Sequence, residues 1–367
     1  MVFTKKRIGL LPIIATLFSA LAFSCFTIVL PQAHASGTTD FNQPGNILIS
    51  DQFNNRVIEV DRNKHIVWSF GSGDPTKCNP GPGAIIGLND AERLSDGLTL
   101  LSGTGIPPNT AESSIPAGCV DNRVIVVDRY GHIVWQYGQA GVTGAGPNQL
   151  NVPVFTIQLP NRNIMIVDQS NERVIEVDRF SKQIVFQYGQ TGVTGSGVNQ
   201  LNNPNSVELL PNGHLLIADE NNNRAIEVTR SKKIVWQTAA SYGGLALNGV
   251  AFASRLPNGN TLLTDSNNNR ILEVTPSGGT VFQYFTNTGQ NSMAMPLPTN
   301  AVKLANGNIS IADQFNDRAF IINAAKHIVF QYGITNVDGT GPDLLNSPYT
   351  AFVIGDYTGQ TRPPNYF

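Results

Sequence analysis

An aspartate recurs through this chain in the pattern D-x-x-N-x-R, and its carboxylate is the most repeated group that could bind a metal ion. The pattern returns roughly every 50 residues, as expected of a structural repeat. Asp and Asn side chains at this spacing accept backbone N–H groups in a tight turn, and the arginine offers a charged partner to the carboxylate. Because a group needed once per repeat usually has a structural role, we interpret the motif as a turn. The clear copies pair Asp51 with Arg56, Asp168 with Arg173, Asp219 with Arg224, Asp265 with Arg270, and Asp313 with Arg318.

A sixth, degenerate copy ends at Arg123. Gly103 stands where the aspartate is expected, and an insertion from Thr104 to Val120 replaces the tight turn.

Short runs of β-branched and aromatic residues surround each motif. In one repeat the runs 206–210, 214–218, 224–228 and 233–237 are separated by Pro-Asn-Gly, by the motif and by a short polar break. No stretch is long enough for an amphipathic helix, so each repeat predicts four antiparallel strands, called A to D from first to last. Radial repetition of such sheets predicts an all-β, six-bladed β-propeller.

The order of the strands indicates how the ring closes. The first predicted strand, 46–50, is a strand B with no strand A before it, while a strand A without a repeat follows at 347–354. Left unpaired, both would expose sheet edges. We therefore expect the closing blade to combine one C-terminal strand with three N-terminal strands.

The turn motif, the P-N-G turn and the loops G-x-x-G-x-G-x-x-x-L-N-x-P at 141–153 and 192–204 resemble the NHL-repeat six-bladed propellers. The resemblance covers roughly residues 46 to 355. It implies a binding scaffold or, as in the peptide-amidating lyases of that family, a zinc enzyme with histidines in the central channel. The strand I-V-[WF]-Q-Y-G also resembles arylsulfotransferase and quinoprotein propellers. An enzyme of that kind is therefore a third possible class of function.

The histidines argue against a zinc lyase. His65, His132 and His327 occupy one repeat position at the start of strand D, the outermost strand of a blade, and His214 opens a strand B alone. Zinc ligands must lie about 2 Å from one metal ion, and residues on separate outer strands cannot converge in this way. No motif of a serine hydrolase, a phosphate-binding loop or an H-E-x-x-H metal site is present.

The central channel offers a second candidate site. Calcium would take six to eight oxygen ligands, and one carboxylate among several amides is a poor set. We therefore predict no cofactor and weak or no calcium binding, while a metal-dependent lactonase- or lyase-like enzyme remains the alternative, with Asp90 and Asn205 as its first candidates. The aligned rim pairs are Asn89-Asp90, Val154-Phe155, Asn205-Ser206, Ala251-Phe252, Thr299-Asn300 and Tyr349-Thr350.

Recognition by loops is the favoured function. The loops 78–87, 238–247 and 285–297 depart from the glycine pattern of the others, and the last two carry Tyr242, Phe285, Met293 and Met295. Irregular loops on a rigid scaffold are typical recognition elements, and Met and aromatic side chains suit protein contacts. We predict a non-catalytic scaffold that binds a protein or a small extracellular ligand through this loop face.

Cys78 and Cys119 are the cysteines that remain outside the N-terminal apolar stretch. Both lie in loops expected on one face, and an even pair in an exported protein predicts a disulfide. Closing about 40 residues would stabilise the fold by about 4 kcal/mol in the chain-entropy model.

The N-terminus predicts export. A basic start at 5–7, an apolar stretch at 8–30 and Ala33-His-Ala35 have the form of a bacterial signal peptide spanning residues 1–35. We expect residues 36–367 to form one secreted, monomeric domain, attached to a membrane only if the segment is uncleaved. Its 21 basic and 26 acidic residues give a net charge of −5, which disfavours nucleic acid as a partner.

Overall fold

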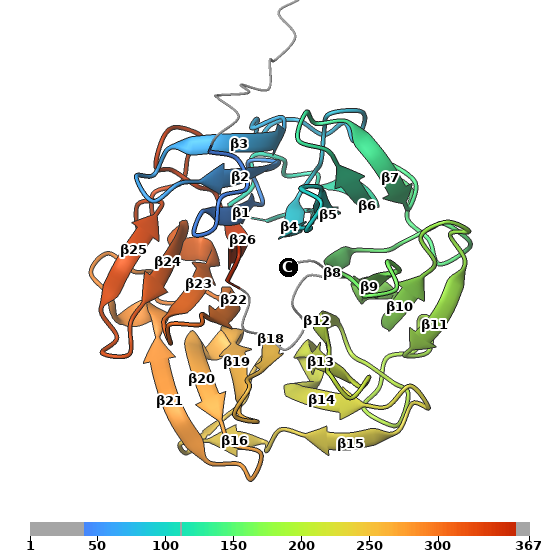
Figure 1. The fold of residues 1–367 in the computed structure, drawn as a ribbon, viewed down its shortest axis with the longest axis vertical. Coiled ribbons are helices and arrows are strands. Elements are labelled where there is room, and N and C mark those ends of the chain that lie inside the picture. The colour runs from blue at the N-terminus through green and yellow to red at the C-terminus, as the bar shows by residue number, and fades with distance from the viewer. Residues whose placement is uncertain (1–39, 111, 357–367) are drawn as a thin grey trace, which may run out of the picture. The chain divides into compact units, whose positions relative to one another are not determined.

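The computed structural model describes residues 40–110 and 112–356, so the predicted signal segment at 1–35 lies outside the described residues. Within them the strands form six four-stranded antiparallel sheets. Figure 1 shows these sheets as blades around a central axis, with the first strand of each blade innermost. The predicted all-β, six-bladed propeller is confirmed.

Each blade is an antiparallel meander of strands A to D. Blade 1 contains β26 (Pro348–Val353), β1 (Ile47–Asp51), β2 (Arg56–Val60) and β3 (Ile66–Gly71). Blade 2 contains β4 (Leu88–Arg93), β5 (Thr99–Ile106), β6 (Cys119–Val127) and β7 (Ile133–Tyr137). Blade 3 contains β8 (Pro153–Gln158), β9 (Ile164–Asp168), β10 (Arg173–Val177) and β11 (Ile184–Tyr188). Blades 4 to 6 contain β12 (Pro204–Leu209), β13 (Leu215–Asp219), β14 (Arg224–Val228), β15 (Ile234–Gln237); β18 (Val250–Arg255), β19 (Thr261–Asp265), β20 (Arg270–Val274), β21 (Thr280–Phe285); and β22 (Pro298–Lys303), β23 (Ile309–Asp313), β24 (Arg318–Ile322), β25 (Ile328–Tyr332).

Several short elements decorate the blades. The hairpin of β16 (Ser241–Tyr242) and β17 (Leu245–Ala246) lies in the loop before blade 5. Turns of 3-10 helix follow strand B at η1 (Gln169–Asn171), η2 (Glu220–Asn222), η3 (Ser266–Asn268) and η5 (Gln314–Asn316), and η4 (Thr286–Thr288) begins a loop. We call the end of the propeller with the B–C turns and D–A loops the loop face, and the end with the A–B and C–D turns the turn face.

The ring closes as the sequence predicted. The C-terminal strand β26 pairs antiparallel with the N-terminal strand β1, matching Ile47 to Val353 and Ile49 to Ala351. β26 is the innermost strand of blade 1 and also contacts blades 2 and 6. The two ends of the chain therefore share one sheet, and its inner strand is buried along most of its length.

The D-x-x-N-x-R motif forms the B–C turn. In blade 3 the Oδ2 atom of Asp168 accepts hydrogen bonds from Nδ2 of Asn171 and Nε of Arg173, both at 2.8 Å, while Oδ1 accepts the N–H of Asn151 at 2.7 Å. Glu172 closes the turn in the left-handed region at φ 57°. The same Asn and Arg bonds to the aspartate recur at Asp51, Asp219, Asp265 and Asp313.

Blade 2 rebuilds this turn from a different residue. Gly103 pairs with Arg123 at the position where other blades have the aspartate, and Asp121 of β6 supplies the carboxylate. Asp121 Oδ2 accepts the N–H of Ile86 at 2.8 Å, and Arg123 donates Nε to Oδ1. A Cβ atom on Gly103 would lie 2.7 Å from Asp121 Oδ2, so the carboxylate fills the space of the absent side chain. The sequence reading did not identify Asp121.

The hydrophobic cores lie between neighbouring blades. One such core joins blades 2 and 3 through Val126, Trp135, Ile164 and Ile175, which are buried on facing sides of the two sheets. The packing of adjacent sheets is thus what holds the innermost strands around the axis. In the described part of the chain, no helix has the length and apolar character needed to cross a bilayer.

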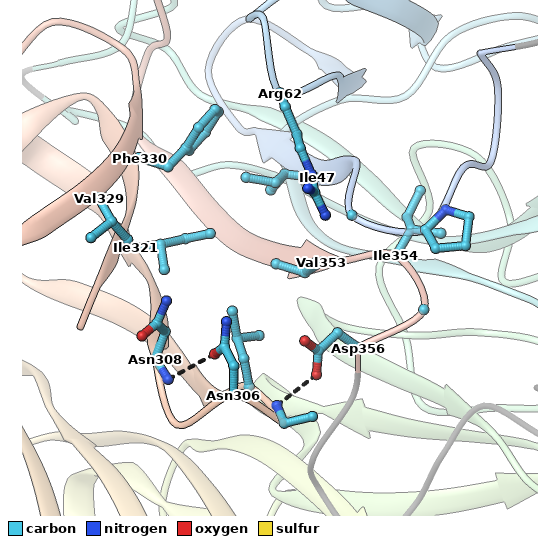
Figure 2. Close-up of a pocket in the computed structure, with 15 residues that line it drawn as sticks. Ile47, Arg62, Asn306, Asn308, Ile321, Val329, Phe330, Val353, Ile354 and Asp356 are labelled. Atoms are coloured by element: carbon cyan, nitrogen blue, oxygen red, sulfur yellow. Dashed lines mark hydrogen bonds between the residues drawn. The ribbon is translucent and has the colours of Figure 1, made fainter. Parts of the chain in front are cut away.

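A groove opens on the turn face at the seam between blades 6 and 1. Its volume is about 630 Å³. Figure 2 shows Arg62 reaching over it from blade 1, Asn306 and Asn308 at one end, and Ile321, Phe330 and Val353 along its walls.

Candidate functional site

A set of six polar side chains, which we call the mouth cluster, meets at the axis on the loop face. Gln314 Nε2 donates to Gln52 Oε1, and Gln52 Nε2 donates to Asn89 Oδ1, both at 2.8 Å. Tyr349 donates its hydroxyl to Asn205 Oδ1 at 3.0 Å. Further side-chain hydrogen bonds join Asn89 to Tyr349 and Asn205 to the carboxyl group of Glu220. The members are Gln52, Asn89, Asn205, Glu220, Gln314 and Tyr349, from blades 1, 2, 4 and 6.

Local structure places these side chains at the axis. Asn89, Asn205 and Tyr349 occupy the second position of their strands A, while Gln52, Glu220 and Gln314 directly follow the aspartate of a B–C turn. The sequence identified the first group and missed the second. Comparing the residue after each motif aspartate would have found it, because Gln and Glu dominate there.

Glu220 and Tyr349 are the titratable groups of the cluster. Desolvation raises the pKa of the Glu220 carboxyl to about 7, although the Asn205 amide opposes the shift. Burial and the neighbouring Glu220 carboxyl raise the pKa of Tyr349. Both residues are partly exposed, so the cluster combines access from the loop face with a carboxyl whose pKa burial raises to about 7.

The axis below the mouth cluster is mostly apolar. A cavity of about 60 Å³ is lined by Phe155, Phe252 and Phe352 together with the carboxyl groups of Glu92 and Glu208. The rings of Phe155 and Phe252 meet edge to face, with centroids 5.5 Å apart. Phe155 therefore lies inside the ring as an apolar plug and not on the loop face.

Asp90 is fully buried and bonded to the next blade. Its Oδ2 accepts the N–H and the hydroxyl of Thr156 at 2.9 and 3.2 Å, and burial raises its pKa to about 7. Glu92 has a pKa raised to about 8 by burial and by the Asp90 carboxyl. Asn300 occupies the position of Asp90 in blade 6, where its Oδ1 accepts the N–H of Ala351 at 3.5 Å. Asp90 and Asn300 thus join blades together and lie apart from the mouth cluster's hydrogen bonds.

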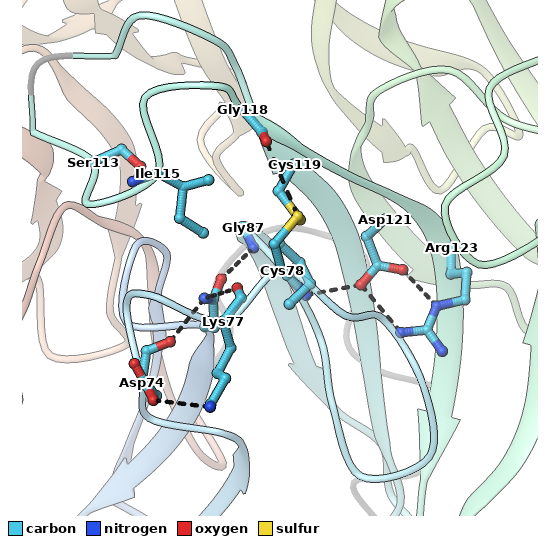
Figure 3. The surroundings of a disulfide bond; sticks show 12 residues. Asp74, Lys77, Cys78, Gly87, Ser113, Ile115, Gly118, Cys119, Asp121 and Arg123 are labelled. Carbon is cyan, nitrogen blue, oxygen red and sulfur yellow. Dashed lines mark hydrogen bonds and ion pairs between the residues drawn. A yellow bond between two sulfur atoms is a disulfide. The ribbon is translucent and has the colours of Figure 1, made fainter.

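The insertion of blade 2 forms an arm over part of the loop face. β5 and β6 extend to the pair Ile106 and Cys119, and Cys119 is joined by a disulfide to Cys78 of the loop that leads into blade 2, as Figure 3 shows. The arm also packs Ile106 and Ile115 against Phe53 and Phe315, which lie in the B–C turns of blades 1 and 6. The predicted disulfide is present in the structure, and the arm is held both covalently and by packing.

The irregular loops differ in what they expose. Tyr242 is buried, and its hydroxyl accepts the N–H of Ala239 at 3.0 Å, so it packs and presents no surface. Met293 is half-buried, and its N–H donates to Asn316. Met295 is 55% exposed. Among these three loop residues, Met295 is the one that a partner could contact fully.

The histidines lie where the sequence predicted. His65 and His132 are exposed at the start of strands D and hydrogen-bond Asp61 and Asp128 of their own turns. His214 bonds Glu227 within blade 4. Among the described residues, no group of three or more His, Cys, Asp or Glu side chains is arranged to hold a metal ion.

No model of a known protein family matches this chain, and no curated protein matches its sequence. Solved structures share its fold. A protein of unknown function from Bacteroides caccae has a TM-score of 0.55 at 15% identity, over 79% of this chain and 93% of its own. A streptogramin B lyase has 0.51 at 14% identity, over 81% and 82%, and virginiamycin B lyase from Staphylococcus aureus has 0.48 at 15%, over 80% and 86%. At such identities, the likeness to the first two structures shows the six-bladed propeller fold alone.

Proposed function

We propose that this protein is an exported, non-catalytic binding scaffold of the NHL-repeat type that recognises its partner on the loop face. The observation that carries the proposal is the arm. Five similar turns form a nearly uniform ring, and a uniform ring cannot distinguish partners. The arm, fixed by Cys78–Cys119 and by its packing on Phe53 and Phe315, breaks that uniformity with a rigid wall beside the mouth cluster.

The charges of the loop face restrict the partner. The arginines of the B–C turns are bound to buried aspartates. In the described D–A loops and B–C turns the one lysine, Lys77, lies 3.8 Å from Asp74. Carboxyl groups of Glu112, Glu172 and Glu220 belong to the same face. A neutral or cationic partner fits this surface, whereas a nucleic acid backbone would be repelled.

The test replaces the part of the arm that projects beyond the strand pair. Substituting residues 107–118 by Asn-Gly keeps Ile106 and Cys119 as the last pair of a two-residue hairpin. Immobilised wild-type protein should capture a partner from the extracellular fraction. The captured amount should fall by well over tenfold on the arm variant and by a smaller factor on Met295→Ser. Phe180→Ser is the matched control, because Phe180 is 84% exposed in a C–D turn of the turn face. If the partner is retained on the arm variant and lost on Phe180→Ser, recognition takes place on the turn face and the proposal is wrong.

Acid–base catalysis at the mouth cluster is the second candidate, and Glu220 favours it. A partly exposed carboxyl with a pKa of about 7, beside the hydroxyl of Tyr349 and the amide of Asn205, has the properties of a general acid or base. A panel of lactones and esters assayed with wild type and Glu220→Gln decides between the two. Turnover that Glu220→Gln abolishes, with an apparent pKa near 7, would favour the enzyme over the scaffold.

A further inference from the structure

In four of the six blades, a glutamate carboxyl on the turn face is bound by side chains of its own blade and by a cation of the next blade. The glutamate lies on strand C opposite an aromatic residue of strand D. In blade 3, Glu176 Oε1 accepts Nδ2 of Asn161 and Nδ2 of Asn163 at 3.1 and 2.7 Å, and Oε2 accepts Nη1 of Arg230 from blade 4 at 2.6 Å. Amides of the A–B turn thus bind one oxygen and a cation of the next blade binds the other.

The same arrangement recurs with different cations. In blade 5, Glu273 is bound by Nδ2 of Asn260 at 2.8 Å and by Nζ of Lys303 from blade 6 at 2.6 Å. In blade 1, Glu59 is bound by Nδ2 of Asn46 and by Arg93 of blade 2. Blade 4 repeats it with Glu227, His214 and Arg255.

Blade 6 keeps the donors and lacks the glutamate. Ile321, opposite Phe330, stands where Glu176 stands opposite Phe186. Asn306 and Asn308 form the same A–B turn as Asn161 and Asn163, with the N–H of Asn308 donating to Asn306 Oδ1 at 2.9 Å. Asn306 is exposed and Asn308 half-buried, and neither side-chain nitrogen donates a hydrogen bond to another described residue.

The cation of the next blade is also present at this seam. Arg62 has the position in the C–D turn of blade 1 that Arg230 has in blade 4, and it makes no ion pair within the described residues. Its guanidinium packs close to Gly45, where an added Cβ atom would lie 2.5 Å from Nη2. Figure 2 shows it pointing over the groove. Packing therefore holds the guanidinium at the groove without a carboxylate partner.

We propose that the groove between blades 6 and 1 binds a monocarboxylate with an apolar chain, whose carboxylate takes the place that glutamate fills at the other seams. Arg62, Asn306 and Asn308 would bind the carboxylate, because a guanidinium forms strong charge-assisted hydrogen bonds to a carboxylate and the equivalent amides bind Glu176 in blade 3. Ile321, Phe330 and Val353 would contact the chain, since loss of the glutamate leaves this wall apolar. This site is independent of the loop face.

Among the described residues that line the groove, Asp356 is the one with a carboxyl group. Asp356 lies on the rim, where its Oδ1 accepts the N–H of Ala305 at 2.7 Å, and it forms no ion pair with Arg62. Residues 1–39, 111 and 357–367 contain no Asp or Glu. No Asp or Glu of those segments can therefore complete the site, and we expect its carboxylate to come from a bound molecule.

Octanoate is a suitable probe, and octanamide is its uncharged match. Isothermal titration of the mature protein should show saturable one-to-one binding of octanoate and at least tenfold weaker binding of octanamide. Arg62→Gln should weaken octanoate about tenfold. Arg179→Gln is the control. Arg179 has the same position in the C–D turn of blade 3 that Arg62 has in blade 1. The neighbouring blade 2 also lacks the glutamate, with Val126 in its place, but its A–B turn contains no amide side chains.

Ile321→Glu tests the origin of the site directly. It should fold, because four blades carry glutamate at this position, and its own carboxylate should abolish octanoate binding. Absence of saturable binding to the wild type, unchanged binding to Ile321→Glu, or equal losses in Arg62→Gln and Arg179→Gln would each overturn the proposal. Binding seen only after removal of residues 357–367 would also overturn it, because the chain itself would then occupy the groove.

Discussion

The hydroxyl of Tyr349 donates to Oδ1 of Asn205 at 3.0 Å, and this bond joins blade 1 to blade 4 on the opposite side of the ring. Neighbouring blades are held by buried sheet faces, whereas blades 1 and 4 approach each other at the axis, where Phe352 and Val207 belong to one apolar cluster. The tyrosine is long enough to reach across the axis, and through Asn89 and Gln52 it connects to the blades on its own side. The mouth cluster therefore stabilises the closed ring and also forms the surface at the centre of the loop face.

Removing this hydroxyl should weaken the ring without changing the fold. Tyr349→Phe leaves Asn205 Oδ1 buried without its donor, and we expect the free energy of unfolding to fall by about 1–2 kcal/mol. Urea denaturation measures the change. Tyr130→Phe is the control, because Tyr130 is 65% exposed. Equal stability of wild type and Tyr349→Phe would show that the bond across the axis contributes nothing.

The axial carboxyls predict that stability falls as pH rises. The pKa values of Asp90 and Glu220 are raised to about 7 and that of Glu92 to about 8. Between their unfolded values near 4 and these folded values the native state binds more protons than the unfolded chain, so the slope of stability against pH is negative. The stabilisation that these protonated carboxyl groups give the folded state is complete below about pH 4 and is lost by about pH 8.

We expect urea midpoints to decrease from pH 5 to pH 8.5. Glu92→Gln removes a titrating group at the axis and should flatten the profile, by on the order of 2 kcal/mol across this range. Asp96→Asn, on an exposed A–B turn, should leave the slope unchanged. A profile that rises between pH 5 and 8.5 would contradict the assignment of protonated axial carboxyls.

The fold could be predicted because each repeat carries its own turn chemistry. Asp51 and Arg56 lie five residues apart, and a local spacing fixes a local hydrogen bond. The mouth cluster could be predicted only in part. Tyr349 and Asn205 are 144 residues apart, and their contact depends on how six sheets close, which no local pattern encodes. Tyr242 was predicted to be a binding residue because its loop is irregular. The β16–β17 hairpin instead packs its ring into the core, which the sequence pattern did not indicate.

Ring closure predicts a strong effect of C-terminal truncation. Deleting residues 346–367 removes β26, including the buried residues Ala351, Phe352 and Val353, and leaves β1 as an open inner edge. We expect aggregation or loss of a cooperative unfolding transition in circular dichroism melts. Deleting 357–367 alone is the control and should preserve a sharp transition. A sharp melt at the wild-type temperature after the longer deletion would contradict closure through β26.

The disulfide should contribute to both stability and arm position. Cys78 and Cys119 are separated by 41 residues, and the chain-entropy model gives about 4 kcal/mol for a loop of this length. Cys78→Ser with Cys119→Ser should lower the free energy of unfolding toward that amount, measured in urea without reductant. Peptide mapping of the unreduced protein should show the two cysteine peptides linked, and full alkylation of both thiols in the native protein would exclude the bond.

The carboxylate of Asp121 stands in for the side chain that Gly103 lacks, and this predicts a compensating pair of substitutions. Asp121→Gly alone leaves the buried guanidinium of Arg123 without its partner and should cost about 3–5 kcal/mol. Gly103→Asp alone should also destabilise, because its Cβ would contact Asp121 Oδ2 at 2.7 Å. The double variant places the aspartate where the other five blades have it, so we expect it to recover at least half of the loss, which a double-mutant cycle in urea measures. Strictly additive losses would show that the two positions do not share one carboxylate site.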